Sequence, residues 1–128
     1  MKVLTIKEPW ASLIINGYKK YEFRSWKTNY RGKILIHTSK LLEKNILKRF
    51  DEYNLDCKCG YIIGEACIAD CIKVDENFNN ELLRIDNIVY ANNHVGIYAW
   101  KLEQIKKYDN PVPCKGKLGL WNYEGVKK

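Results

Sequence analysis

The chain has 128 residues, of which 46% are hydrophobic and 29% charged, and it carries a formal net charge of +7. This length and composition are typical of one globular domain, here expected to span residues 1–128. No apolar run reaches the roughly 18 residues that cross a bilayer, and the N-terminus is charged too early for a signal peptide, so we expect a cytoplasmic protein with no membrane partner.

The first third of the chain predicts three strands and one short helix. Residues 3–6 form the first strand. The helix that follows begins near Pro9 and ends at Gly17, which is the usual placement of these two residue types at helix ends. The segment 21–26 is a second strand, and the β-branched segment 33–38 is a third, buried one.

A second helix is expected over residues 39–53, with Thr38 or Ser39 as its N-cap. Its inner face would be apolar at helical spacing. That face would consist of Leu42, Ile46, Leu47 and Phe50. A loop is expected from there to residue 60.

The remaining chain alternates strands with polar segments. In a long strand at 61–74, Gly64 indicates a bulge or a bend. The side chains expected to share one face of it are Ile62, Ala66, Ile68, Ile72 and Val74. A polar helical or irregular insertion at 75–93, a strand at 95–102, an extended loop at 109–113 and a last strand at 118–123 follow. Five or six mixed strands with two or three helices predict an α+β fold, a small curled β-barrel with helices packed on it.

The strongest functional signal lies just after the first helix. Strand side chains alternate, so Glu22, Arg24 and Trp26 are expected on one face, with Lys19 directly upstream. This set is typical of a pocket for a planar, polar ligand. Arg24 would bind a phosphate or carboxylate, and Glu22 would accept from an exocyclic amine of a base. A surface ion pair is the alternative.

The aromatic side chains divide into binding and core candidates. Trp26 and Trp10 are candidates for stacking on a base, although Trp10 lies on the apolar face of its helix and could be core. Trp100 and Trp121 are expected in the core. His37 is expected to be a buried, hydrogen-bonded histidine, and we assign no role to His94. Arg31 and Lys33, on either side of a glycine, are either phosphate contacts or part of an exposed turn.

Neither a metal nor another cofactor is expected. The five cysteines are an odd number, which argues against a disulfide framework. Four of them could supply thiolates, but their spacing does not suit a structural zinc site, so buried free thiols are expected. These four are Cys57, Cys59, Cys67 and Cys71.

The net charge is concentrated at the two ends of the chain. Residues 1–50 carry net +9, residues 51–100 net −6, and residues 101–128 net +4. If the two ends meet in the fold, they form a basic surface that attracts polyanions. The alternative is that these lysines serve solubility only.

Several motifs together resemble a known family. They are the segment 7–11 (KEPWA), the pattern Gly17-x-Lys19-x-x-Glu22-x-Arg24, the segments 30–32 (YRG), 34–37 (ILIH) and 98–100 (YAW), and the closing run 111–121 (PVPCKGKLGLW). The set resembles the ASCH domain of the PUA-like superfamily, over nearly the whole chain. The resemblance implies a PUA-like β-barrel with a cleft between the barrel and the first helix, in which members are proposed to bind RNA, DNA or modified nucleotides.

One branch of that family resembles an amidohydrolase that removes the acetyl group from N4-acetylcytidine. The resemblance implies a catalytic lysine in the G-x-K step, here Lys19, and a threonine where this chain has Glu22. The third member, a later glutamate, would be Glu65, Glu76 or Glu81.

Two main functions follow from these residues. The first is a binding module for RNA, single-stranded DNA or a nucleotide, which uses the residues Trp10, Lys19, Glu22, Arg24, Trp26 and Arg31. We expect Glu22 to keep Lys19 charged, which suits binding better than proton abstraction. The second is an amidohydrolase in which Lys19 activates water and Glu22 orients it. A third hypothesis is a protein partner recognised by the acidic segment 51–100.

Overall fold

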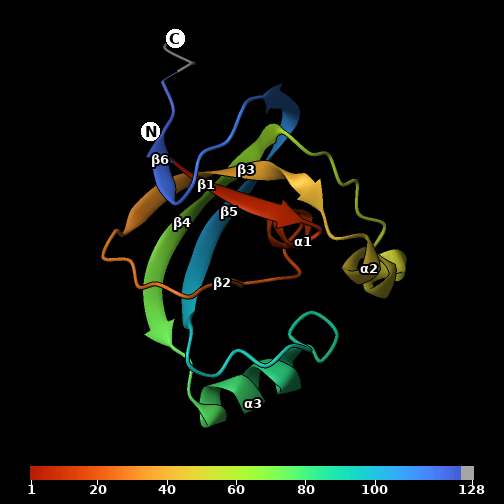
Figure 1. Ribbon diagram of the computed structural model, residues 1–128, viewed down its shortest axis with the longest axis vertical. Helices are drawn as coiled ribbons and strands as arrows, with labels where there is room; N and C mark the ends of the chain where they lie inside the picture. The colour runs from red at the N-terminus through yellow and green to blue at the C-terminus, as the bar shows by residue number, and fades with distance from the viewer. Residues whose placement is uncertain (125–128) are drawn as a thin grey trace.

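The computed structural model describes residues 1–124 and contains one six-stranded mixed sheet with three α-helices (Figure 1). The strands are β1 (Lys2–Glu8), β2 (Tyr21–Arg24), β3 (Gly32–Leu42), β4 (Tyr61–Lys73), β5 (Tyr98–Pro113) and β6 (Leu120–Asn122). The helices are α1 (Trp10–Ile15), α2 (Lys44–Leu47) and α3 (Glu76–Ile85), and a 3-10 helix, η1 (Lys48–Tyr53), continues α2.

The sheet has the order β2-β5-β4-β3-β1-β6. β1 runs parallel to β3, and every other pair is antiparallel. The first and last strands of the chain, β1 and β6, are neighbours, so the two ends of the chain meet, which is the condition set above for a combined basic surface. The edge strands β2 and β6 are not hydrogen-bonded to each other within residues 1–124. The α+β class, the strand count and the helix count are therefore confirmed, whereas the structure shows a curled sheet with an open seam.

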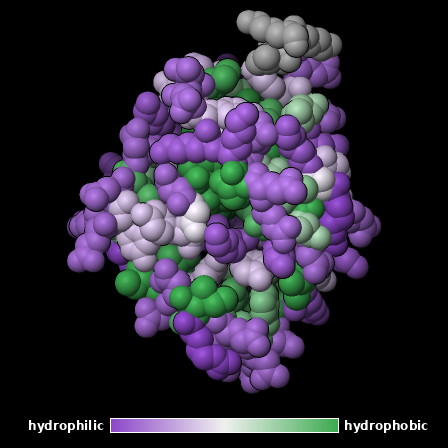
Figure 2. All heavy atoms as spheres, turned by 180° about the vertical axis from the view of Figure 1, so that it is seen from behind, coloured by the Kyte–Doolittle hydropathy of each residue, from purple (hydrophilic) through white to green (hydrophobic). Residues whose placement is uncertain are grey.

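The core is built around α1. This helix packs against β1, β3, β4 and β5, and residues 11–15 are all buried. Figure 1 shows the strands curling around it, with α3 beyond β2. A second cluster joins Leu13 of α1 to Phe50 of η1 and Leu82 of α3. The face of the molecule seen in Figure 2 is largely hydrophilic, with separate hydrophobic areas between the polar side chains.

The two ends of α1 determine where the next strand begins. The carboxylate of Glu8, fully buried, accepts from the backbone N–H of Ser12 at 2.8 Å and from its hydroxyl at 2.6 Å. The first of these bonds satisfies one of the N-terminal N–H groups that a helix leaves without partners. At the other end Gly17 has φ +86°, and the N–H groups of Tyr18 and Lys19 both donate to the Leu13 carbonyl. This turn directs the chain into β2.

The predicted helix at 39–53 is wrong over its first residues. β3 continues to Leu42, which pairs with Glu8 of β1, so pairing between strands overrides the local helical pattern. The helix begins at Lys44 and changes to 3-10 geometry at Lys48. Thr38 is not an N-cap, because its hydroxyl bonds to the backbone of Tyr61 instead.

The loop predicted at 109–113 is also wrong, because β5 extends to Pro113. β2 covers β5 only from Tyr98 to Lys101, so the later part of β5 has a single neighbour. An edge position of this kind tolerates the two prolines, which lack an N–H group. β5 begins at Tyr98 rather than at residue 95.

The bulge predicted at Gly64 is confirmed by a shift in the pairing of β4 with β5 between Ile62 and Gly64. The shift has a consequence that strict alternation misses. Ile62 packs with Val3, Leu35 and Trp121, whereas Ala66 and Ile68 belong to the core around α1. The predicted single face of β4 is therefore wrong at Ile62.

Candidate functional site

A cleft of about 620 Å³ opens at the seam of the sheet. β6 pairs with β1 only from Lys2 to Leu4, so the edge of β1 is free from Thr5 onward. The guanidinium of Arg24 spans this gap, and its Nη2 donates to the Thr5 carbonyl at 2.7 Å. The cleft therefore lies where β2 faces β1 beyond the end of β6, and its volume suits a small-molecule ligand or a nucleotide unit.

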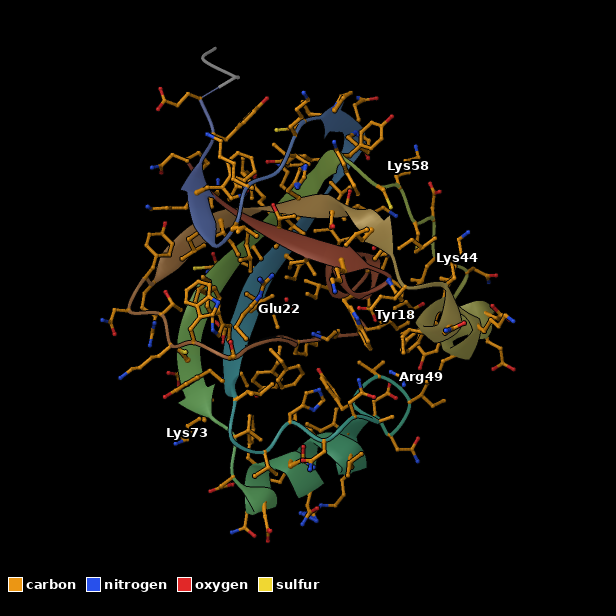
Figure 3. All side chains as sticks on the ribbon, in the orientation of Figure 1. Tyr18, Glu22, Lys44, Arg49, Lys58 and Lys73 are labelled. Carbon is orange, nitrogen blue, oxygen red and sulfur yellow. The ribbon has the colours of Figure 1, made fainter. Side chains whose placement is uncertain are left out.

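Three of the predicted residues converge here. Glu22 is 7% exposed and accepts from Lys19 Nζ at 3.2 Å and from Arg24 Nε at 3.0 Å, through different oxygens. Figure 3 shows Glu22 near the middle of the molecule, at β2. Lys19 and Arg24 are thus held on the two sides of one carboxylate. Arg24 Nη1 has no hydrogen-bond partner within residues 1–124, so it is free to meet a ligand.

Lys19 lies under the cleft rather than in solvent. Its side chain is 3% exposed, and Nζ donates to the Tyr21 carbonyl and lies 4.8 Å from the ring centre of Phe23. Burial lowers the pKa of Lys19, and the opposing attraction of Glu22 is smaller. The carboxylate of Glu22 acts in the predicted direction, because it favours the charged form, but desolvation of this buried ammonium has the larger effect on the pKa.

The predicted stacking residue Trp26 lines the cleft and is 38% exposed. It follows β2, which ends at Arg24, and its ring meets the buried ring of Trp100 edge to face at 4.7 Å. Trp100 Nε1 also donates to the Trp26 carbonyl at 3.3 Å. Both the ring and the backbone of Trp26 are thus held by a core residue, while part of the ring stays accessible.

Of the other tryptophans, Trp100 and Trp121 lie in the core as predicted, and Trp10 has both of its predicted positions, in the cleft and against the core. Trp10 lines the cleft and also packs on the core, with its ring edge to face with Phe50 at 5.7 Å. Trp100 and Trp121 are buried. His37 is a buried, hydrogen-bonded histidine as predicted, because Nδ1 lies 3.1 Å from Thr5 Oγ1 and Nε2 lies 2.6 Å from the Cys114 carbonyl.

His94 is one of the cleft residues that sequence reasoning missed. Its ring stacks on Phe23 at 3.7 Å between centres, and burial together with the charge of Lys19 lowers its pKa to about 4. His94 reaches the cleft from the loop after α3, and the same loop also supplies Asn92. No sequence motif links this loop to β2. His94 could have been predicted only by assuming that the polar insertion covers the cleft.

The loop before β6 supplies a further wall. Lys117 and Leu118 line the cleft, and Leu118 is 98% exposed. Gly116 fixes this loop, because a Cβ there would lie 2.7 Å from the ring of His37. Four of the cleft's side chains are cations and two are carboxylates, so the cleft carries net positive charge. The cations are Lys7, Lys19, Arg24 and Lys117.

Some predicted residues lie elsewhere. Arg31 does not line the cleft; it is exposed, donates to the Thr28 carbonyl at 2.9 Å and lies 3.8 Å from Asp70. Glu65 bonds to Tyr108 and pairs with Lys33 on the sheet. Neither Glu76 nor Glu81, both on α3, is among the cleft-lining residues within 1–124.

The cysteines are free thiols in intermediate positions. Within the described residues no group of three or more histidine, cysteine or acidic side chains could hold a metal ion. No helix among residues 1–124 is long and apolar enough to cross a membrane.

Comparisons with known proteins find related sequences and related structures. A model of the ASCH domain matches residues 4–113. Activating signal cointegrator 1 from Homo sapiens is 48% identical over 98% of this chain, and the Mus musculus protein of that name is 28% identical over the same share. The chain spans 23% of the length of each of these relatives.

Solved structures show the same fold. The crystal structure of ASCH from Zymomonas mobilis aligns with a TM-score of 0.62 at 14% identity and covers 97% of this chain and 87% of that one. A point mutant of the same protein aligns at 0.54 and 17% identity, over 88% and 74% of the two chains. At these identities the likeness concerns the fold alone.

Proposed function

The chain belongs to the ASCH domain family, and from that premise we propose that its cleft binds RNA, single-stranded DNA or a nucleotide by accepting one nucleotide unit. The observation that carries the proposal is the convergence of Lys19, Glu22 and Arg24 on one open cleft beside a partly exposed tryptophan. Charged groups fixed beside an aromatic face are what a base with a phosphate requires.

Each side chain has a distinct part in the proposed binding. Trp26 offers a ring on which a base stacks. Arg24 Nη1 donates to a phosphate or to a base oxygen. Glu22 already accepts from two cations, but a carboxylate has further lone pairs and can accept from an exocyclic amine. Lys7 and Lys117 at the mouth of the cleft attract the backbone.

The main alternative is hydrolysis of an acylated nucleoside by Lys19. The lowered pKa of Lys19 favours it, because a base must lose its proton. Two observations favour binding. Lys19 Nζ already donates to both the Tyr21 carbonyl and Glu22. The three later glutamates considered above also do not line the cleft within residues 1–124. Acetate release from N4-acetylcytidine that is lost in Lys19→Ala would establish the alternative.

The proposal is tested by the salt dependence of oligonucleotide binding. We expect fluorescence anisotropy to show that the protein binds a labelled single-stranded oligonucleotide. The logarithm of the association constant should fall linearly with the logarithm of the salt concentration. Arg24→Gln should weaken binding about tenfold or more, whereas Arg84→Gln, which removes an equal charge from the exposed end of α3, should not. Absence of binding at low salt, or binding without salt dependence, would contradict the proposal.

A further inference from the structure

Three buried side-chain nitrogen atoms have no hydrogen-bond partner within residues 1–124, and they belong to two residues. They are Nε and Nη2 of Arg49 and Nδ1 of His94. Buried polar groups without partners are rare in native proteins and each requires an explanation. The two residues are far apart in the chain, but the charge of Arg49 acts on His94, so they lie close enough to interact.

His94 lines one end of the cleft, and Arg49 lies next to residues that line it. The guanidinium of Arg49 lies 5.5 Å from the ring centre of Trp10, and its Nη1 donates to Asn92 Oδ1 at 3.4 Å. Trp10, Asn92 and His94 all line the cleft. In Figure 3, Arg49 lies between the helical segment 44–53 and the loop after α3. The guanidinium is therefore directly behind the wall that Trp10 and Asn92 form.

Arg49 is also a cation without an anion. None of the ion pairs found among residues 1–124 involves it. Its contacts are two aromatic rings, Trp10 and Phe50, and one long hydrogen bond to Asn92. Nε and Nη2 form one edge of the guanidinium, which is the edge that binds two oxygens of a phosphate side by side. Asn92 accepts from Nη1, so it does not occupy this edge.

We propose that this end of the cleft is an oxyanion subsite, in which the Nε–Nη2 edge of Arg49 and the Nδ1–H of His94 bind one phosphate group of the nucleic acid. The assignment rests on the proposed function and adds to it where a phosphate sits. His94 donates as the neutral tautomer with its proton on Nδ1, and its ring is held in place by stacking on Phe23. A base stacked on Trp26 and a phosphate at Arg49 would then occupy one cleft.

The first test compares Arg49→Lys with Arg84→Lys. Both changes keep the charge, but lysine cannot form the two parallel bonds. Oligonucleotide affinity should fall about tenfold or more in Arg49→Lys and stay unchanged in Arg84→Lys. Inorganic phosphate should displace the oligonucleotide from the unchanged protein better than chloride at equal ionic strength, and this advantage should disappear in Arg49→Lys.

The second test avoids removing Arg49 from its aromatic contacts. Asn92→Asp places a carboxylate beside Nη1, so we expect a higher melting temperature and loss of the advantage of phosphate over chloride. Asn93→Asp is the matched control, since it adds the same charge and keeps the acceptor that Val95 N–H uses at 3.0 Å. That variant should keep the advantage of phosphate.

The outcomes separate the subsite from the proposed function. Oligonucleotide binding that is equal in folded Arg49→Lys and the unchanged protein overturns the subsite and leaves the proposed function standing. Phosphate competition that survives in Asn92→Asp overturns the subsite as well. If no oligonucleotide binds but inorganic phosphate raises the melting temperature in an Arg49-dependent way, the subsite stands and the proposed function fails.

Discussion

Glu22 holds the charged part of the cleft together, because its two oxygens bond to cations that arrive from different directions. Lys19 comes from the turn after α1, and Arg24 reaches across from β2 to the backbone of β1. A buried lysine without this carboxylate would be an uncompensated charge. The carboxylate also keeps Arg24 extended across the seam, so one side chain fixes the positions of two potential ligand contacts.

Trp26 should contribute to binding without contributing much to stability. Trp26→Ala removes the exposed ring on which a base stacks. Such stacking contributes about 1–3 kcal/mol per base to the binding free energy. We expect oligonucleotide affinity to fall about 5- to 160-fold, measured by anisotropy at fixed salt. Trp10→Ala provides the contrast, because Trp10 also packs against the buried Phe50 and should lose stability as well as affinity.

If Trp26→Ala bound the oligonucleotide as tightly as the unchanged protein, stacking on this ring would be excluded. If Trp26→Ala binds the oligonucleotide more weakly, its melting temperature distinguishes a loss of stacking from a loss of stability. The ring of Trp26 meets that of Trp100 only edge to face, and the alanine variant keeps the carbonyl that Trp100 Nε1 bonds to, so a large fall in melting temperature would mean that the ring supports the core instead of the ligand.

At the scale of elements, the short helix α1 is the part that positions the site. Its N-terminus is closed by Glu8, its C-terminus by Gly17, and the Lys19 N–H is tied to the Leu13 carbonyl. A change at either end of α1 therefore reaches Lys19 through the backbone. The helix has six residues, too few to be stable alone, so its geometry depends on burial and on these bonds.

Ser12→Ala should destabilise the fold through Glu8. The hydroxyl of Ser12 donates to the fully buried carboxylate at 2.6 Å, and burial already raises the pKa of Glu8. Loss of the donor leaves a buried acceptor undersatisfied, which costs about 1–3 kcal/mol. Urea unfolding at neutral pH measures the loss. Ser39→Ala removes only an exposed bond to Leu41 N–H and should cost less than about 0.5 kcal/mol; equal losses in the two variants would contradict this account.

Local patterns predicted the elements where burial and sequence agree. The Pro9 and Gly17 boundaries of α1 and the bulge at Gly64 are of this kind. They failed where pairing between distant strands decides the conformation. Leu42 is extended because it pairs with Glu8, and Pro111 can lie in a strand, although it lacks an N–H group, because this part of β5 pairs only with β4. Neither fact can be read from a local window of sequence.

At the scale of the whole molecule, the cleft is assembled from segments that the sequence keeps far apart. Lys19, Glu22 and Arg24 lie within six residues of one another, so one motif predicted them. His94 and Lys117 come from loops that reach the cleft only because β5 and β6 bring them back to β2 and β1. The order of strands, which no pattern in the chain specifies, is therefore what completes the site.

The pH dependence of stability combines groups from several of these segments. Burial and the charge of Lys19 depress the pKa of His94 from 6.5 to about 4, with Arg49 adding to this and Glu22 opposing it. Burial raises the pKa of Glu8, and hydrogen bonds from Tyr108 and Lys33 lower the pKa of Glu65. Acidification below pH 6.5 therefore lowers the stability of the fold through His94, whereas the raised pKa of Glu8 acts in the opposite direction.

His94→Gln isolates the contribution of His94, because the other groups cancel in a difference. Between pH 6.5 and about 4 the unfolded chain binds a proton at residue 94 that the folded protein does not. The unchanged protein should therefore lose stability on acidification relative to His94→Gln, by less than about 1.4 kcal/mol per pH unit since the ring is only partly buried. Urea unfolding of both proteins across this range measures the difference. Parallel curves would mean that His94 is hydrated in the folded state, and a difference that grows above pH 6.5 would have the wrong sign for a buried neutral imidazole.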